Sequence, residues 1–143
     1  MIKIDRPALP TEWLRFVPLK TLYEFDGPRI FTCVDVNGQM FLAYQCDEDT
    51  DGMQFLVVPL EEELVSRLVK GLLSVRDALR RSPMWLVEAN NEWTPIRCWA
   101  VEFDELPKRA LPKPDTLLWA HLQNGPSVQT EVATSTPSLT GSA

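Results

Sequence analysis

The side chains that could perform catalysis are few and widely spaced in this 143-residue sequence. The single histidine is His121, and the three cysteines lie far apart, at Cys33, Cys46 and Cys98. A cysteine–histidine dyad needs contact between its two side chains, and no further residues complete such a constellation. Three carboxylates near a predicted late hairpin, Glu88, Glu102 and Asp104, are expected at outward-facing strand positions. We therefore predict no catalytic residue and no cofactor, and the alternative is a small hydrolase or nuclease that uses scattered carboxylates.

Residues 47–52 (DEDTDG) match the start of a calcium-binding loop, because carboxylates alternate and a turn glycine follows. A glutamate should close such a loop at its twelfth position, which here is Val58, and helices rather than strands should flank it. We interpret the segment as a solvated hairpin loop. Zinc is not expected either, since the sequence has one histidine and no Cys-x-x-Cys pair. No metal site is predicted.

Positive charge is concentrated around two predicted helices. The five cations are Arg67, Lys70, Arg76, Arg80 and Arg81. Arg76 and Arg80 are four residues apart, so they share one helix face. The net charge of −6 and the lack of interleaved aromatic residues argue against direct nucleic-acid binding. We interpret the five cations, with Trp93 as an exposed anchor beside a turn, as a site for an acidic protein partner, and the alternative is a solvated helix face.

These residues are positioned by a predicted antiparallel meander of four strands over residues 19–59. Its turns are marked by Asp26-Gly27-Pro28 and by Asn37-Gly38, and Asn-Gly between apolar runs is a strong hairpin signal because both residues tolerate positive φ. A two-residue turn at Asn37-Gly38 sets the register. The pairs that it predicts are Val34–Phe41, Cys33–Leu42, Phe31–Tyr44 and Arg29–Cys46.

In this register one face of the sheet carries five residues together: Arg29, Phe31, Cys33, Leu42 and Tyr44. Both faces hold apolar pairs, so each face needs a cover. The cover is either the protein's own helices and C-terminal segments or a partner subunit. For the face of Phe31 we expect core.

Two helices follow the meander. Residues 61–71 (EEELVSRLVKG) are predicted to form a helix that Gly71 ends, and Leu60, Leu64, Leu68 and Leu72 form its apolar stripe. Ser74 caps the second helix, which ends before Pro83. A second hairpin is predicted over residues 84–89 and 95–103.

The two ends of the chain are predicted to be less regular. Ile2 and Ile4 indicate a short edge strand, and Thr11 caps a helical turn that contains Trp13 and Phe16. Asp115 caps a short last helix over residues 116–124. The Ser/Thr/Pro-rich residues 126–143 are predicted to be disordered, because they have too few apolar groups to form a packed structure. The fold expected is one α+β domain over residues 1–125 with this tail.

The composition is that of an ordinary globular protein, with 45% hydrophobic and 24% charged residues. The N-terminal residues include no apolar signal region, and no apolar run approaches the ~18 residues of a membrane span. The odd number of separated cysteines argues against a secreted disulfide framework. We expect a cytoplasmic location and no membrane contact.

Nine positions carry a resemblance to a known family: Tyr23, Asp26, Gly27, Pro28, Val58, Pro59, Ser74, Arg76 and Ala78. They fit the patterns Y-x-x-DGP, VP before a helix, and S-x-R-x-A at a helix start. Over about residues 19–90 the chain resembles a family of small bacterial domains of unknown function. The resemblance implies a bacterial or phage origin and supports the fold, and it transfers no catalytic residue.

The function predicted is that of a non-enzymatic protein–protein interaction or regulatory subunit in a bacterial multiprotein system, for example of the defence or toxin–antitoxin type. A protein partner is expected, and the oligomeric state is left open. Besides the hydrolase or nuclease, a third hypothesis is an acidic inhibitor that occupies the nucleic-acid-binding site of a target protein.

Overall fold

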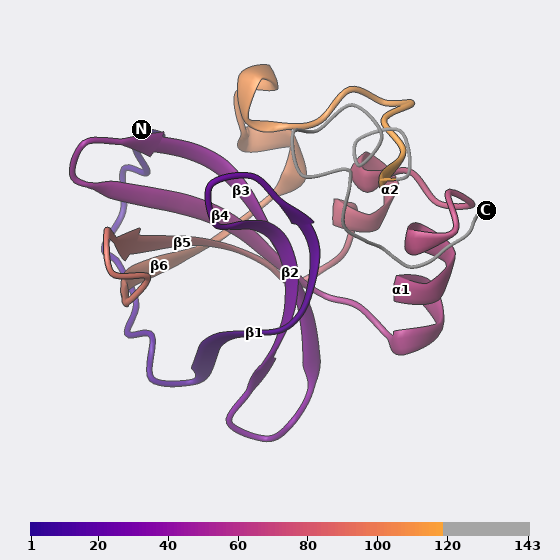
Figure 1. Cartoon of the computed structure of the whole chain (residues 1–143). Helices are drawn as coiled ribbons and strands as arrows, with labels where there is room; N and C mark the ends of the chain where they lie inside the picture. Colours follow the sequence, from indigo (N-terminus) through magenta and orange to yellow (C-terminus); the bar gives the residue numbers. More distant parts are fainter. Residues whose placement is uncertain (119–143) are drawn as a thin grey trace.

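The computed structural model describes residues 1–118, and its centre is one antiparallel sheet of six strands in sequence order (Figure 1). The strands are β1 (Leu14–Glu24), β2 (Pro28–Asp35), β3 (Met40–Asp49), β4 (Gly52–Pro59), β5 (Met84–Asn90) and β6 (Pro95–Val101). Helices α1 (Glu62–Val69) and α2 (Val75–Leu79) connect β4 to β5 and lie to one side of the sheet. Two 3₁₀ turns follow β6: η1 (Phe103–Glu105) and η2 (Lys108–Ala110).

The α+β class is confirmed, but the meander of four strands with a separate second hairpin was wrong. Strand β5 pairs with β4 from Gly52↔Asn90 to Val57↔Trp85, so all six strands form a single meander. The physical reason lies in β4, which is apolar along most of its length and almost completely buried. Such a strand needs neighbours on both edges and cover on both faces. The predicted last helix, apart from its first three residues, and the predicted tail lie outside the described residues.

The register predicted for β2 and β3 was wrong by one residue. The observed pairs are Ile30↔Tyr44, Phe31↔Ala43, Thr32↔Leu42, Cys33↔Phe41 and Val34↔Met40. Gly38 N–H donates to Asp35 O at 3.1 Å, and Asp35 N–H donates to Gln39 O at 3.0 Å, which makes a three-residue loop. The Asp35 carboxylate stabilises this loop by accepting from the N–H groups of Asn37 and Gln39. A one-residue slip turns every side chain of a strand to the other face of the sheet. Leu42 and Tyr44 therefore project from one face of the sheet and Phe31 projects from the other.

The N-terminal predictions also need correction. Thr11 begins a turn rather than a helix, and Leu14 and Phe16 are inward-facing residues of β1. Ile2 forms no strand. Its N–H donates to Gln54 Oε1 at 2.8 Å, and its carbonyl accepts from Gln54 Nε2 at 2.8 Å, so a buried side-chain amide takes the place of a partner strand.

Each face of the sheet has its own core. On the helix side, Leu42, Leu56 and Leu86 of the strands lie in one core with Leu68 of α1 and Leu79 of α2. The other face is aromatic, and β1 covers it with Phe16, whose ring lies 5.3 Å from Phe31 and 4.9 Å from Phe55. Phe31 is fully buried, which confirms the expectation that its face is core.

The ends of the helices follow local rules. Ser74 Oγ accepts from Asp77 N–H at 3.1 Å, as predicted for an N-cap. At the end of α1, Gly71 adopts φ +76° and Leu72 N–H donates back to Arg67 O, which is a glycine C-terminal motif. The helix has therefore ended before Leu72, whose side chain is exposed rather than part of the apolar stripe.

Candidate docking surface on the two helices

The thiols are poorly placed for nucleophilic chemistry. Cys33 and Cys98 are buried, and the half-buried Cys46 Sγ donates to Gln54 O at 3.5 Å. Burial raises the pKa of the Cys33 and Cys46 thiols to about 12 and also raises that of Cys98. Because the thiolate is the reactive form, these groups are weak nucleophiles near neutral pH. His121 lies outside the described residues.

The carboxylates of the second hairpin do not converge. Glu88 accepts from Arg97 and from Gln54 Nε2 on β4, so it already has a cationic and an amide partner. Glu102 follows β6 and caps η1, which contains Asp104. Glu88 pairs across the sheet with Arg97, which precedes Glu102 by five residues. At ~3.4 Å per residue the backbone positions of Glu88 and Glu102 are therefore about 17 Å apart along the strand, which does not favour paired acid–base chemistry between them.

The acidic segment 47–52 contains the last three residues of β3, the turn at residues 50–51 and the first residue of β4. Asp47 pairs with Arg109 at 2.6 Å, and Glu48 pairs with Arg29 at 2.7 Å. Asp49 Oδ1 accepts from the N–H groups of Asp51 and Gly52, which closes the turn. The hydrogen bond from Arg109 lowers the pKa of the Asp47 carboxyl. The carboxylates thus face different partners, and residues 1–118 contain no group of three or more side chains arranged to hold a metal ion.

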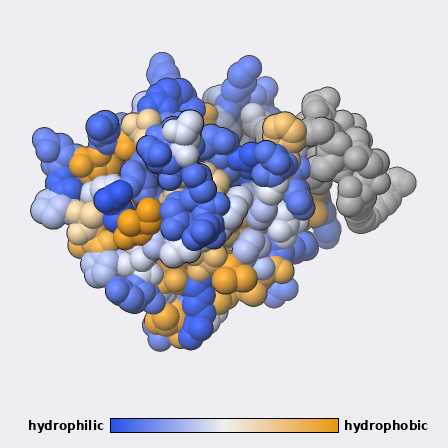
Figure 2. Space-filling model, turned by 60° about the vertical axis from the view of Figure 1, so that its left-hand side comes forward, coloured by the Kyte–Doolittle hydropathy of each residue, from blue (hydrophilic) through white to orange (hydrophobic). Residues whose placement is uncertain are grey.

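The surface of the described region includes two hollows large enough to hold a small ligand. The first, about 390 Å³, lies where the β1–β2 hairpin diverges from β3, and each charged side chain that lines it has an ionic partner. The second, about 360 Å³, lies between the N-terminal residues and η1, where Arg6 pairs with Glu105 at 2.9 Å. The face shown in Figure 2 is mostly hydrophilic, with apolar atoms in separate patches. These features provide neither a charged ligand site nor one broad apolar interface.

The helical side carries a group of five cations that have no ionic partner among the described residues. We call the five predicted cations the basic helical surface: Arg67, Lys70, Arg76, Arg80 and Arg81. Within residues 1–118, none of the five lies within 4.0 Å of a carboxylate oxygen. Of the five other arginines in the same region, four are paired with carboxylates, namely Arg6, Arg29, Arg97 and Arg109, whereas Arg15 on β1 is not. The Nε atom of Arg81 is also buried without a hydrogen-bond partner among the described residues.

The ring of Phe103 contacts the guanidinium groups of both Arg76 and Arg80. The guanidinium carbons of Arg80 and Arg76 lie 4.5 Å and 5.2 Å from the centre of its ring. Arg76 also donates from Nη1 to the carbonyl of Pro112 at 3.1 Å, whereas Arg80 is exposed. The sequence showed no aromatic residue interleaved with these cations, because Phe103 arrives from η1 through the tertiary fold. No local signal in the sequence could have identified it.

Trp93 does not join this surface. Its ring is half-buried in the aromatic core, 5.6 Å from Phe55 and 6.4 Å from Phe31, and its backbone adopts φ +65°. That core lies on the sheet face opposite the helices. The structure therefore brings five of the six predicted partner-binding residues to the helical side and places the sixth among core aromatics.

Comparisons with known proteins give a family but no activity. Searches of the curated proteins and of the solved structures found no match to the chain. Within residues 1–118, no helix combines the length and the apolar character needed to cross a membrane. Residues 15–133 match a family of unknown function, DUF6575, and the match covers most of the chain. This protein belongs to that family.

Proposed function

We propose that the protein is a non-enzymatic interaction subunit of a bacterial multiprotein complex, and that its basic helical surface binds an acidic surface of a partner protein. One observation carries this proposal: an acidic chain of net charge −6 leaves its helical cations without carboxylate partners, while it neutralises most arginines elsewhere in the described region.

The charge arrangement suits protein docking. Three acidic residues, Glu61, Glu62 and Glu63, lie at the start of α1, and Arg67 lies in the last turn of that helix. Asp77 lies on α2 between Arg76 and Arg80, but within residues 1–118 it forms no ion pair with either. The cations therefore remain available to carboxylates of a partner. Complementary charge on a partner would steer association and fix its orientation. Nucleic acid is a weaker candidate, because the overall negative charge of the chain opposes the approach of a polyanion.

The chemistry of the remaining side chains supports a non-enzymatic role. The described thiols have raised pKa values, and the carboxylates of the second hairpin are separated or already paired. We also propose a cytoplasmic location, since Cys33, Cys46 and Cys98 are free thiols, and free thiols persist in a reducing compartment.

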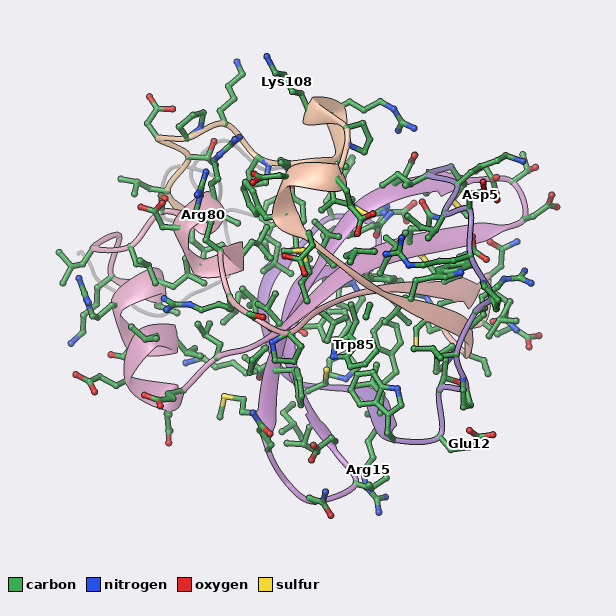
Figure 3. The ribbon with its side chains drawn as sticks, turned by 180° about the vertical axis from the view of Figure 1, so that it is seen from behind. Asp5, Glu12, Arg15, Arg80, Trp85 and Lys108 are labelled. Carbon is green, nitrogen blue, oxygen red and sulfur yellow. The ribbon has the colours of Figure 1, made fainter. Side chains whose placement is uncertain are left out.

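A charge-reversal experiment tests the proposal. The double variant Arg67→Glu/Arg80→Glu is compared with Arg15→Glu/Lys20→Glu, which changes the net charge by the same amount on exposed residues of β1. Arg15 and Arg80 lie far apart in the molecule (Figure 3). The wild-type protein is used to isolate a partner from an extract of the source organism. The partner is then identified, produced alone and titrated calorimetrically with each variant.

We expect the helical variant to weaken binding at least tenfold and the β1 variant to bind nearly as the wild type does. The affinity for the wild type should fall as the salt concentration rises, because exposed charges are screened. Equal affinities for the two folded variants would contradict the proposal.

A further inference from the structure

We infer that Arg80, supported by Phe103 and Arg76, is the point at which the basic helical surface holds carboxylate groups of an acidic peptide segment. This inference rests on the proposed function and names the chemical group that the surface recognises. It distinguishes a specific contact within the surface from general attraction between opposite charges.

The first argument is the geometry of the two guanidinium groups. Both lie against the single ring of Phe103, at 4.5 Å for Arg80 and 5.2 Å for Arg76. Contact with an aromatic face attracts a cation and restricts the movement of a long side chain. An arginine that is already ordered loses less conformational entropy when it binds a carboxylate.

The second argument is the availability of donors. Arg76 uses Nη1 for the carbonyl of Pro112, which ties α2 to the segment after η2 and makes this arginine partly structural. Arg80 makes neither a side-chain hydrogen bond nor an ion pair within residues 1–118, so its planar set of N–H groups is free to bind a carboxylate through two parallel bonds. Arg80 is therefore the residue that binds the carboxylate directly, and Arg76 adds positive charge beside it.

The third argument concerns the size of the ligand. Neither of the two hollows described above is lined by residues of α1 or α2. A small anion would remain solvated on the exposed helices and gain little. An extended acidic segment can reach Arg80 and also pass the exposed Arg67 and Lys70 on α1, which adds several charge contacts. An acidic peptide is therefore favoured over a small anion.

The test separates arginine geometry from charge. The full chain, labelled with ¹⁵N, is titrated with a peptide of eight glutamates, and the Nε–Hε signals of the arginines are followed by NMR. Arg80→Lys keeps the charge but removes the planar donor set, and Arg15→Lys is the matched control on β1. Phe103→Leu removes the ring and serves as a second variant, with thermal unfolding used to confirm that each variant is folded.

We expect saturable shifts of the Arg80 and Arg76 signals in the wild type. Arg80→Lys should weaken peptide binding at least fivefold, Phe103→Leu should weaken it to a smaller extent, and Arg15→Lys should leave it unchanged. Wild-type affinity in the folded Arg80→Lys variant would overturn the inference, and so would the absence of shifts at Arg80. Equal or tighter binding of an eight-residue oligothymidylate would also overturn it and would indicate a nucleic-acid ligand. The proposed function fails separately, through the charge-reversal experiment with the natural partner.

Discussion

Replacing Phe31 with alanine tests whether the aromatic face of the sheet is core or interface. Phe31 has no exposed surface, and its ring makes edge contacts with Phe16 at 5.3 Å, Phe55 at 5.7 Å and Trp93 at 6.4 Å. The variant removes the ring that these three share. Because β1 passes over this face and holds Phe16 in place, the surrounding structure cannot easily collapse into the space left behind.

The expected loss of stability follows from these contacts. Truncation of a buried phenylalanine costs ~3–5 kcal/mol, and each aromatic pair contributes about 0.5–1.5 kcal/mol beyond the area buried. With three such pairs lost, we expect a value in the upper part of that range, about 4–5 kcal/mol. For a domain of this size the midpoint of thermal unfolding should fall by roughly 15 °C.

The assay is urea unfolding, followed by tryptophan fluorescence and by circular dichroism. Phe25→Ala is the matched control, because Phe25 is 50% exposed at the β1–β2 turn and its loss should cost less than about 1 kcal/mol. A Phe31→Ala protein that unfolds at the wild-type urea concentration would refute the reasoning. It would show that this face is packed only when a partner covers it.

Three further predictions follow from single groups. Gln54→Leu should lower the free energy of unfolding by about 2–4 kcal/mol, because it removes two hydrogen bonds to Ile2 and one to Glu88. An unchanged midpoint in a urea titration would contradict this prediction. Millimolar calcium should leave the thermal midpoint unchanged, since Asp47 and Asp49 are already bonded within the protein, and a saturable increase that disappears in Asp49→Ala would reverse this view. Burial raises the pKa of the Cys33 thiol from 9.0 to about 12, so its contribution to stability is complete below pH 9.0 and is lost as the pH rises toward 12. The urea concentration at the unfolding midpoint should therefore fall over that pH interval, and it should fall less steeply in Cys33→Val.

The features that were predictable from sequence are those decided by neighbouring residues. The N-cap at Ser74 and the helix stop at Gly71 depend on hydrogen bonds within a few residues, and both were found. The turn at Asn37-Gly38 was also found, but its length was not. Asp35 decided the length, because its carboxylate accepts two backbone N–H groups of the loop and favours three residues over two. Aspartate is common at the first position of a turn, where its side chain accepts backbone hydrogen bonds. The sequence-based register did not take Asp35 into account, and it therefore placed Leu42 and Tyr44 on the wrong face of the sheet.

The features that could not be predicted depend on contacts between distant segments. The apolar run at the start of β5 indicates a strand, but it does not say whether that strand pairs with β4 or forms a separate hairpin. The ring beneath Arg76 and Arg80 comes from η1, more than twenty residues later in the chain. The basic residues were therefore identified from sequence, whereas the position of Arg76 and Arg80 on Phe103 and the lack of ion pairs of the five cations within residues 1–118 emerged only from the fold.

The division of the core between two faces of the sheet explains how stability and docking can be separated in this protein. Phe31 and its aromatic neighbours belong to one core, and the residues of α2 belong to the other. Substitutions at distant sites without shared partners have additive effects on stability. Charge reversal at Arg80 should therefore leave the Phe31 contribution intact, and the double variant Phe31→Ala/Arg80→Glu should show the sum of the two single losses. Loss of binding in a stable Arg80 variant would then report on the docking surface itself, because the aromatic core lies on the other side of the sheet.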